Sequence, residues 1–264
     1  MIDFEQKPSY DVADLVEIVR ILRAPGGCPW DREQDHHSIR RDLLEEAYEV
    51  AEAIDEESPA HLREELGDLL LQVVMHSRME EEAGRANLSD VADGICKKLI
   101  YRHPHVFGDV TVSGSGQVLE NWEELKKKEK HQKTASDSVD AVARSLPGLW
   151  RAEKIQKKAA KVGFDWDSVD GAMAKLREET DELQAAIRDG SNVEEELGDL
   201  LFAAVNVARF VKTDPEGAMT AACDKFARRF RAVEEAAQAQ GRELSSMTLA
   251  EMDALWDAVK QREA

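Results

Sequence analysis

The chain has 264 residues with 54 acidic side chains against 35 Lys and Arg, and its formal net charge of −19 argues against nucleic acid as a partner, because phosphate backbones select basic protein faces. A total of 15 Gly and 7 Pro in a sequence rich in helix-forming residues favours an all-α protein over a β-protein with many tight turns. The three cysteines are scattered and form no CxxC pair, and no secretory leader is visible. No apolar run reaches the roughly 20 residues that a membrane span needs. We therefore expect a cytoplasmic protein without a membrane partner.

The first half of the sequence predicts five helices, whose bounds follow from apolar residues at helical spacing and from the breakers between them. We expect these helices at about 11–24, 36–56, 59–83, 88–103 and 117–130. The first ends at the Pro- and Gly-rich stretch 25–29, and Trp30 follows in a loop. Ser58 and Pro59 are typical of an N-cap and a first helical residue. Pro104 stops the fourth helix, and we expect residues 104–116 to form a loop.

The second half repeats this order of elements. We expect helices at about 148–162 and 168–188, one that begins at a capping box over 191–194 and runs to 211, one at about 215–240, and a last one capped by Thr248. Strong apolar periodicity is lost over 131–145. We therefore predict an N-terminal domain at 1–130, a linker at 131–146 and a C-terminal domain at 147–264. Short connections favour antiparallel neighbours, so each domain should be a small helical bundle.

A repeated acidic pattern organises both halves. The heptad EELGDLL occurs at 64–70 and again at 195–201, and an EExxE cluster precedes each copy, at 45–49 and at 178–182. Residues three and four apart share one face of a helix, so two antiparallel helices would bring four or five carboxylates into one cleft. Such like charges repel unless a cation neutralises them, and carboxylate oxygens suit Mg²⁺ or Mn²⁺. The alternative is a solvated acidic face.

Two further patterns recur after the acidic clusters. Basic residues stand four apart at Lys98 and Arg102, and again at Lys225 and Arg229. A Trp and a Lys also stand four apart, in the pairs Trp122 with Lys126 and Trp256 with Lys260. Metal with Lys and Arg suits a triphosphate, and a Trp ring can stack on a base. Taken singly, each Trp could instead anchor a core and each basic pair could form surface ion pairs.

Together these motifs resemble the MazG family of nucleoside triphosphate pyrophosphohydrolases. The resemblance rests on EExxE with EELGDLL, on GCPWD at 27–31 and on RHPHVFGD at 102–109, and it covers about residues 10–262. It implies an all-α fold of two tandem MazG-like helical-bundle domains, usually in a homodimer. It also implies Mg²⁺-dependent cleavage between the α- and β-phosphates, which yields a nucleoside monophosphate and pyrophosphate in a house-cleaning role on the nucleotide pool.

The resemblance also assigns site residues by motif. It makes four acids of each copy metal ligands: Glu179, Glu182, Glu196 and Asp199 in the second, and Glu46, Glu49, Glu65 and Asp68 in the first. Nucleotide contacts would be Lys175, Glu178, Lys225, Arg229, Trp256 and Lys260, with Lys98, Arg102, Trp122 and Lys126 as their counterparts in the first half. Glu178 and Glu179 are both candidates for the general base. Asp42 stands where the second copy has Lys175, and an acid there would repel phosphate, so we expect the second copy to carry most of the turnover.

Other functions stay open at this point. One alternative is a non-catalytic module that senses nucleotide or metal and acts through a protein partner. Another is a di-iron bundle, which needs Glu-x-x-His on two helices, whereas the sequence has that spacing only at Glu33 and His36. A single Trp stack tolerates any base, so we expect broad use of NTPs and dNTPs, with a narrower role on dNTPs or damaged nucleotides as the alternative.

Overall fold

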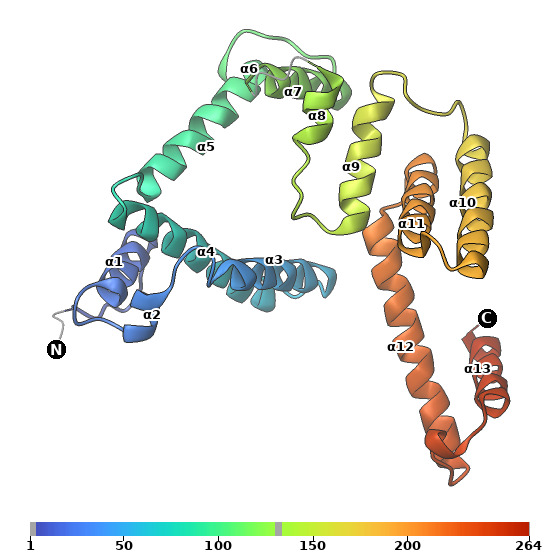
Figure 1. Ribbon diagram of the computed structural model, residues 1–264. Helices are drawn as coiled ribbons and strands as arrows, with labels where there is room; N and C mark the ends of the chain where they lie inside the picture. The colour runs from blue at the N-terminus through green and yellow to red at the C-terminus, as the bar shows by residue number, and fades with distance from the viewer. Residues whose placement is uncertain (1–3, 130–133, 264) are drawn as a thin grey trace. The chain divides into compact units, whose positions relative to one another are not determined.

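The computed structural model describes residues 4–129 and 134–263, and this part of the chain contains helices and no strand (Figure 1). The predicted all-α class is therefore confirmed. The chain divides into two compact units, Met1–Lys126 and Lys127–Ala264. Residues 131–133 of the predicted linker lie outside the described residues, and Ala135–Asp140 of the same segment form a helix, α8, that packs on the second unit's next helix.

The described residues of the first unit contain six whole helices and most of a seventh, which runs on past Lys126. They are α1 (Val12–Arg23), α2 (Pro29–Glu33), α3 (Arg40–Asp55), α4 (Pro59–Glu82), α5 (Leu88–Arg102), α6 (Pro104–Phe107) and α7 (Ser115–Glu129). Two expectations were wrong here, because Trp30 lies in α2 and the segment 104–116 begins with α6. Both short helices start at a proline, which is well placed at a first helical position although it stops a preceding helix.

The core of the first unit forms around α4, which contacts α1, α3 and α5. Val19 of α1, Ile39 and three residues of α4 make one buried apolar cluster. Side-chain caps hold the helix starts, since Asp11 accepts from the Asp14 amide and Ser58 accepts from the His61 amide. Helices α3 and α4 pack against each other, and they carry the first acidic pattern.

The second unit has α11 at its centre, in contact with α9, α10 and α12. Its further helices are α9 (Gly148–Ala160), α10 (Val169–Asp189), α11 (Val193–Phe210), α12 (Pro215–Ala239), a 3₁₀ turn η1 (Leu244–Ser246) and α13 (Leu249–Glu263). The capping box expected at 191–194 does not form. Asn192 is itself the N-cap of α11, in the left-handed region at φ 48°, and it makes no side-chain cap, so Ser191 lies one residue too early.

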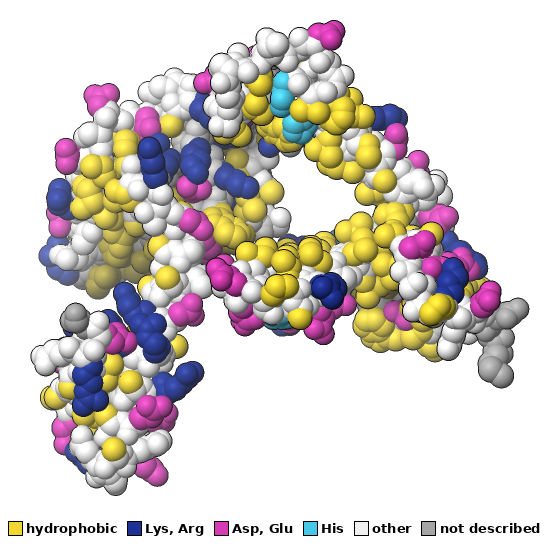
Figure 2. Space-filling model, turned by 180° about the vertical axis from the view of Figure 1, so that it is seen from behind, with side chains coloured by type: hydrophobic (Ala, Val, Ile, Leu, Met, Phe, Trp, Pro, Cys, Tyr) yellow, Lys and Arg dark blue, Asp and Glu magenta, His cyan; other side chains and the backbone are white. Residues whose placement is uncertain are grey.

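Large apolar side chains stay exposed on several helices. On α5 these are Val91, Ile95, Leu99, Ile100 and Tyr101, and on α12 they include Phe226 and Phe230. Figure 2 shows such hydrophobic side chains open on the face that it presents. No helix in the described ranges combines the length and the apolar character that a membrane crossing needs. The α5 side chains are 41–51 % exposed, and Phe226 stays 58 % exposed although it packs on Trp256 of the same unit.

Candidate active site

The two acidic patterns lie on two pairs of neighbouring helices, α3 with α4 and α10 with α11. In the second unit, carboxylate oxygens of Glu179, Glu196 and Asp199 all lie within 4.8 Å of one another. In the first unit, those of Glu46, Glu49 and Glu65 do the same. The helical spacing of the acids therefore does bring carboxylates from consecutive helices together, as the sequence predicts.

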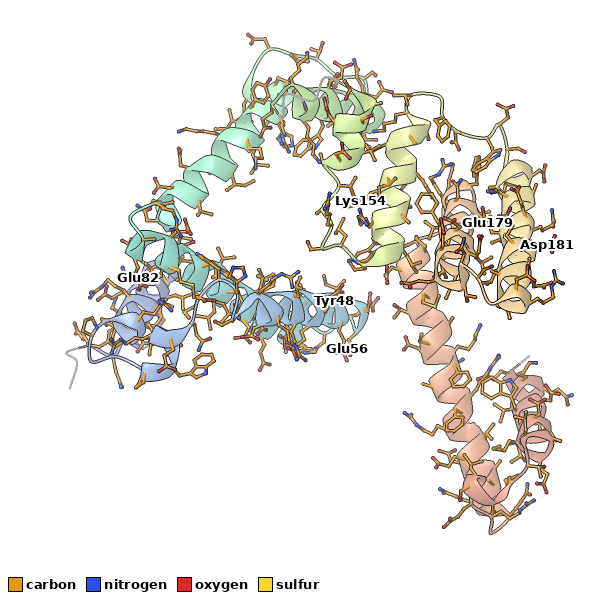
Figure 3. All side chains as sticks on the ribbon, in the orientation of Figure 1. Tyr48, Glu56, Glu82, Lys154, Glu179 and Asp181 are labelled. Carbon is orange, nitrogen blue, oxygen red and sulfur yellow. The ribbon has the colours of Figure 1, made fainter. Side chains whose placement is uncertain are left out.

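Glu179 is the most buried acid of the second cluster, with 5 % of its surface exposed (Figure 3). Its Oε1 atom lies 2.6 Å from Nζ of Lys175, and its Oε2 atom is buried without a hydrogen-bond partner among the described residues. Lys175 also lies 2.7 Å from Glu178, and these two carboxylates raise the pKa of its ammonium group. A buried carboxylate oxygen without a partner is costly, and a bound cation would satisfy it.

Glu182 lies beside Glu179 on α10. A hydrogen bond with Glu179, followed by burial, raises the pKa of the Glu182 carboxyl. Two close carboxylates disfavour each other's charged form when no cation separates them. The acids of the second unit thus form a compact negative group, with Lys175 as the one cation that the described residues pair with it.

The first cluster differs in its neighbours. Burial, and then the charges of Asp68, Glu49 and Glu65, raise the pKa of the Glu46 carboxyl. Here a histidine stands next to the acids, because Nε2 of His61 lies 3.1 Å from Oε1 of Glu65. A hydrogen bond with Glu56 raises the pKa of the His61 imidazole. Asp42 stands at the place of Lys175. The first unit therefore keeps the carboxylates and lacks the lysine that stands next to them in the second.

A cavity of about 390 Å³ opens beside the second cluster. Its walls include Lys175, Glu179 and Asp199 together with residues of α9, α11 and the loop between α9 and α10: Ile155, Gln156, Ala159, Phe164, Asp165, Trp166, Phe202, Ala203, Asn206 and Arg209. A Cβ atom on Gly171 would lie 2.4 Å from Cδ1 of Trp166, so the glycine allows this ring to pack against α10.

Two buried amides face this cavity, and sequence reasoning missed both. Gln156 donates from Nε2 to the carbonyl of Phe202 at 2.7 Å, which leaves its buried Oε1 as an acceptor without a partner in the described part of the chain. Asn206 accepts from the Arg209 guanidinium through Oδ1. Their signal in the sequence is a polar residue on the apolar face of a helix, at the positions where α9 and α11 meet.

The predicted basic and Trp–Lys residues lie apart from the acids. In the second unit all four are on α12 and α13: Arg229 lies 2.6 Å from Glu263, Lys260 lies 3.3 Å from Asp257, the Trp256 ring lies 5.2 Å from that of Phe226, and Lys225 is exposed. Among the described residues, no hydrogen bond, ion pair or ring contact joins them to the α10–α11 acids. The contacts that they do make lie within α12 and α13.

The counterparts in the first unit behave similarly. The Arg102 guanidinium lies 5.2 Å from the centre of the Trp122 ring, which also meets His103 edge-on. Lys98 is exposed on α5, and Lys126 lies on α7 near Trp122 in sequence. Arg102 is buried, so this contact ties the end of α5 to α7. Neither half brings its Trp–Lys pair to its own acidic cluster through a described contact.

His36, the histidine of the Glu33-x-x-His36 spacing, takes part in a different group. Its Nδ1 atom lies 2.8 Å from Nδ1 of His76, and its Nε2 atom lies 2.8 Å from Glu80. The two imidazole rings are stacked at 5.1 Å. These residues are separate from the acids that cluster on α3 and α4, which leaves the di-iron alternative without its second histidine site in the described residues.

Comparison with known proteins places both clusters in one family. The family model of the MazG nucleotide pyrophosphohydrolase domain matches residues 34–107 and 168–233. The chain is 46 % identical over 254 residues to the nucleoside triphosphate pyrophosphohydrolase of Escherichia coli K12, covering 94 % of this chain and 97 % of that protein. It is 42 % identical over 247 residues to the nucleoside triphosphate pyrophosphohydrolase/pyrophosphatase MazG of Thermotoga maritima, covering 94 % of each. It is 49 % identical over 263 residues to the uncharacterized protein YabN of Bacillus subtilis, covering 98 % of this chain and 54 % of that one.

Proposed function

The chain belongs to the MazG nucleotide pyrophosphohydrolase family, and we propose that it hydrolyses nucleoside triphosphates to nucleoside monophosphate and pyrophosphate at the acidic cluster of its second unit. The observation that carries this assignment is the convergence of Glu179, Glu196 and Asp199 beside Lys175 at one cavity. Carboxylates next to a single lysine suit a metal-bound polyphosphate, because the acids hold the cation and the lysine meets a phosphate oxygen.

The residues of this cluster fit a divalent cation of the Mg²⁺ or Mn²⁺ type. Glu179, Glu182, Glu196 and Asp199 would hold it, and the partnerless Oε2 of Glu179 is an oxygen that it would satisfy. When bound, the ion supplies neutralisation of the negative charge that develops on the phosphate oxygens. The fit rests on the oxygen-only donor set and on the raised pKa of Glu182, which a nearby cation would bring down.

The chain's own side chains supply the remaining chemistry. Lys175, now held by Glu178 and Glu179, would move its ammonium group to a phosphate oxygen when a triphosphate arrives. A carboxylate would accept the proton of the attacking water as the bond between the α- and β-phosphates breaks. Both Glu178, which is exposed, and Glu179, which is buried, contact Lys175. Since Lys175 would bind the phosphate, both carboxylates would lie near the attacking water, and both are proposed as the base.

The cavity beside the acids is the proposed place of the nucleoside. The Trp166 ring offers a stacking surface, and Oε1 of Gln156 offers a buried acceptor. Because stacking tolerates any base, we propose broad use of NTPs and dNTPs. We also keep four residues as proposed nucleotide contacts: Lys225, Arg229, Trp256 and Lys260. They would contact a nucleotide bound either by the same chain or by a second copy of it.

The exposed apolar faces support a homodimer. Helix α5 presents five large apolar residues that are 41–51 % exposed, and Phe226 and Phe230 of α12 are 58 % and 46 % exposed. Burial of such faces against a second copy would remove them from water at about 25 cal/mol per Å². The three cysteines are free thiols, which suits the reducing cytoplasm that we propose for the protein and for a house-cleaning role on the nucleotide pool.

The first unit is proposed as the weaker copy. Asp42 would repel a phosphate where Lys175 would attract one, and His61 already pairs with Glu65. The proposed function is tested by measuring pyrophosphate release from a panel of NTPs and dNTPs with and without Mg²⁺. Release that needs the metal is expected, and no metal-dependent release from any of them would overturn the assignment.

A further inference from the structure

A second cavity, of about 560 Å³, lies in the second unit between α9, the end of α11 and the start of α12. Four cationic side chains line it: Lys154, Lys157, Arg209 and Lys212. Two acids, Glu153 and Asp214, line it as well. A hollow with this excess of positive charge stands out in a chain whose net charge is −19.

Both acids of this cavity interact with other side chains. Glu153 lies 2.6 Å from Lys157. Asp214 accepts from Nε1 of Trp150 at 2.8 Å and also caps α12. By contrast, neither Lys154, labelled on α9 in Figure 3, nor Lys212 forms an ion pair with another described residue. The hydrogen bonds of Asp214 do not cancel its charge, but Lys154 and Lys212 together still leave the lining with a net positive charge.

The backbone at Lys212 provides an independent observation. This residue follows α11 in the left-handed region, at φ 58°, where an L side chain is disfavoured. Glycine takes the left-handed position after α4, α10 and α12, whereas Glu57 after α3 and Lys212 after α11 take it with a side chain. Lys212 thus lines the cavity from a disfavoured backbone conformation.

We infer that this cavity is a binding site for a phosphate-bearing anion, with Lys154 and Lys212 in contact with its phosphate oxygens. Ammonium groups suit this task because they form strong charge-assisted hydrogen bonds with phosphate. The Trp150 ring, fixed by its bond to Asp214, forms a rigid wall of the site. Pyrophosphate, the product of the proposed reaction, and the phosphates of a nucleotide both carry the chemistry that the site recognises.

Arg209 links this site to the catalytic cavity, since it lines both. Its guanidinium pairs with Asp165, whose neighbour Trp166 forms a wall of the catalytic cavity. An anion in the second cavity competes with Asp165 for Arg209 and loosens that wall. The site therefore regulates turnover, and an occupied site lowers it. This regulatory part rests on the proposed function, whereas the binding site itself does not.

Calorimetric titration of the full chain with inorganic pyrophosphate tests the site, in EDTA so that no metal bridges the anion to the acids. Wild type is expected to bind, and the Lys154→Ala/Lys212→Ala variant should bind at least about tenfold more weakly. The control is Lys175→Ala, which removes a lysine next to the acidic cluster and not one in this cavity. It should bind pyrophosphate as wild type does. Absence of binding by wild type, affinity of the double variant within about twofold of wild type, or loss of binding in Lys175→Ala would each overturn the site.

A second variant separates recognition from folding. Lys212→Gly removes the ammonium group and relieves the left-handed backbone, so it should raise the melting temperature while weakening pyrophosphate binding. Unchanged binding in this better-folded variant contradicts the role of Lys212. ATP titrated in the same buffer shows whether phosphate is the shared determinant: the double variant should lose affinity for both ligands, and an undiminished affinity for both contradicts the proposal.

The regulatory part has its own readout. Nucleoside monophosphate formation is followed by chromatography over a range of nucleotide concentrations, with Mg²⁺ in excess. Because a nucleotide can also occupy the site, wild type should slow both at high nucleotide and with added pyrophosphate. The Lys154→Ala/Lys212→Ala variant should keep the wild-type rate at low nucleotide and respond less to both. Equal inhibition of both proteins overturns the regulatory part. If neither wild type nor the variant turns over nucleotide, the proposed function is contradicted. The calorimetric result then still tests the binding site.

Discussion

The Nζ atom of Lys175 lies 2.6 Å from Oε1 of Glu179, while Oε2 of the same carboxylate is buried without a hydrogen-bond partner in the described residues. One side of this carboxylate thus faces a cation of the chain, and the other has none. The proposed function uses both oxygens. A bound ion would contact Oε2, and Lys175 would leave Oε1 to bind a phosphate oxygen. The first unit has no such pair, since Asp42 stands where the lysine would be.

The raised pKa of Glu182 predicts a pH dependence of stability. Its hydrogen bond with Glu179 and its burial raise its pKa above the ordinary value of 4.5. A group with a raised folded pKa contributes stability that is present below the ordinary value and is lost as the pH rises through the folded value. Without metal, the melting temperature of wild type should therefore fall relative to that of Glu182→Gln as the pH rises above 4.5.

Thermal melting of both proteins in EDTA across this pH range measures the difference, and Mg²⁺ should recover the stability of wild type at neutral pH. Glu194→Gln is the matched control, because Glu194 is an exposed acid of α11 outside the cluster. A difference between wild type and Glu182→Gln that stays constant with pH contradicts the account.

The glycine inside each acidic heptad gives a second prediction. In the structure, a Cβ atom on Gly67 or Gly198 meets nothing within 4 Å. Replacement of a solvent-facing helical glycine by alanine typically stabilises by about 1 kcal/mol. We therefore expect Gly198→Ala to raise the free energy of unfolding by that amount in urea titrations at low protein concentration. Destabilisation would contradict the solvent-facing position of Gly198.

The choice between two tryptophans is a third prediction. The sequence favours Trp256 as the stacking ring, whereas the cavity beside the acids is lined by Trp166. If the nucleoside lies in that cavity, Trp166→Ala should raise the KM for nucleotides by about tenfold. Trp30→Ala, the matched change in the first unit, should leave it unchanged. A larger effect of Trp256→Ala in the same steady-state assay would move the nucleoside to the α12–α13 pair.

Much of the fold and the meeting of the acids could be predicted from the sequence, because both depend on helical periodicity. Residues spaced three and four apart define a helix face wherever the helix lies, so Glu179, Glu196 and Asp199 were candidates before any packing was known. The short helices α2 and α6 were missed because a proline ends one helix and starts the next with equal ease. Helices this short have too few residues to show the periodic spacing of apolar side chains.

The cavity could not be predicted in the same way. Gln156 and Asn206 lie on different helices, and only the packing of α9 on α11 brings them to one hollow. The basic and Trp–Lys pairs differ from the acids in this respect. Their repeat is a feature of the sequence, and their packing partners, such as Phe226 for Trp256 and Glu263 for Arg229, come from α12 and α13. Their role as nucleotide contacts stays a prediction.

The most direct test compares Glu179→Gln with Glu46→Gln, two like changes at corresponding acids of the two units. Nucleoside monophosphate formation from an NTP is measured for both variants and wild type at saturating Mg²⁺, with folding checked by circular dichroism. The account predicts that Glu179→Gln lowers the rate by at least about 100-fold, while Glu46→Gln keeps most of it. A larger loss from Glu46→Gln, or a rate of Glu179→Gln close to that of wild type, would contradict hydrolysis at the acidic cluster of the second unit.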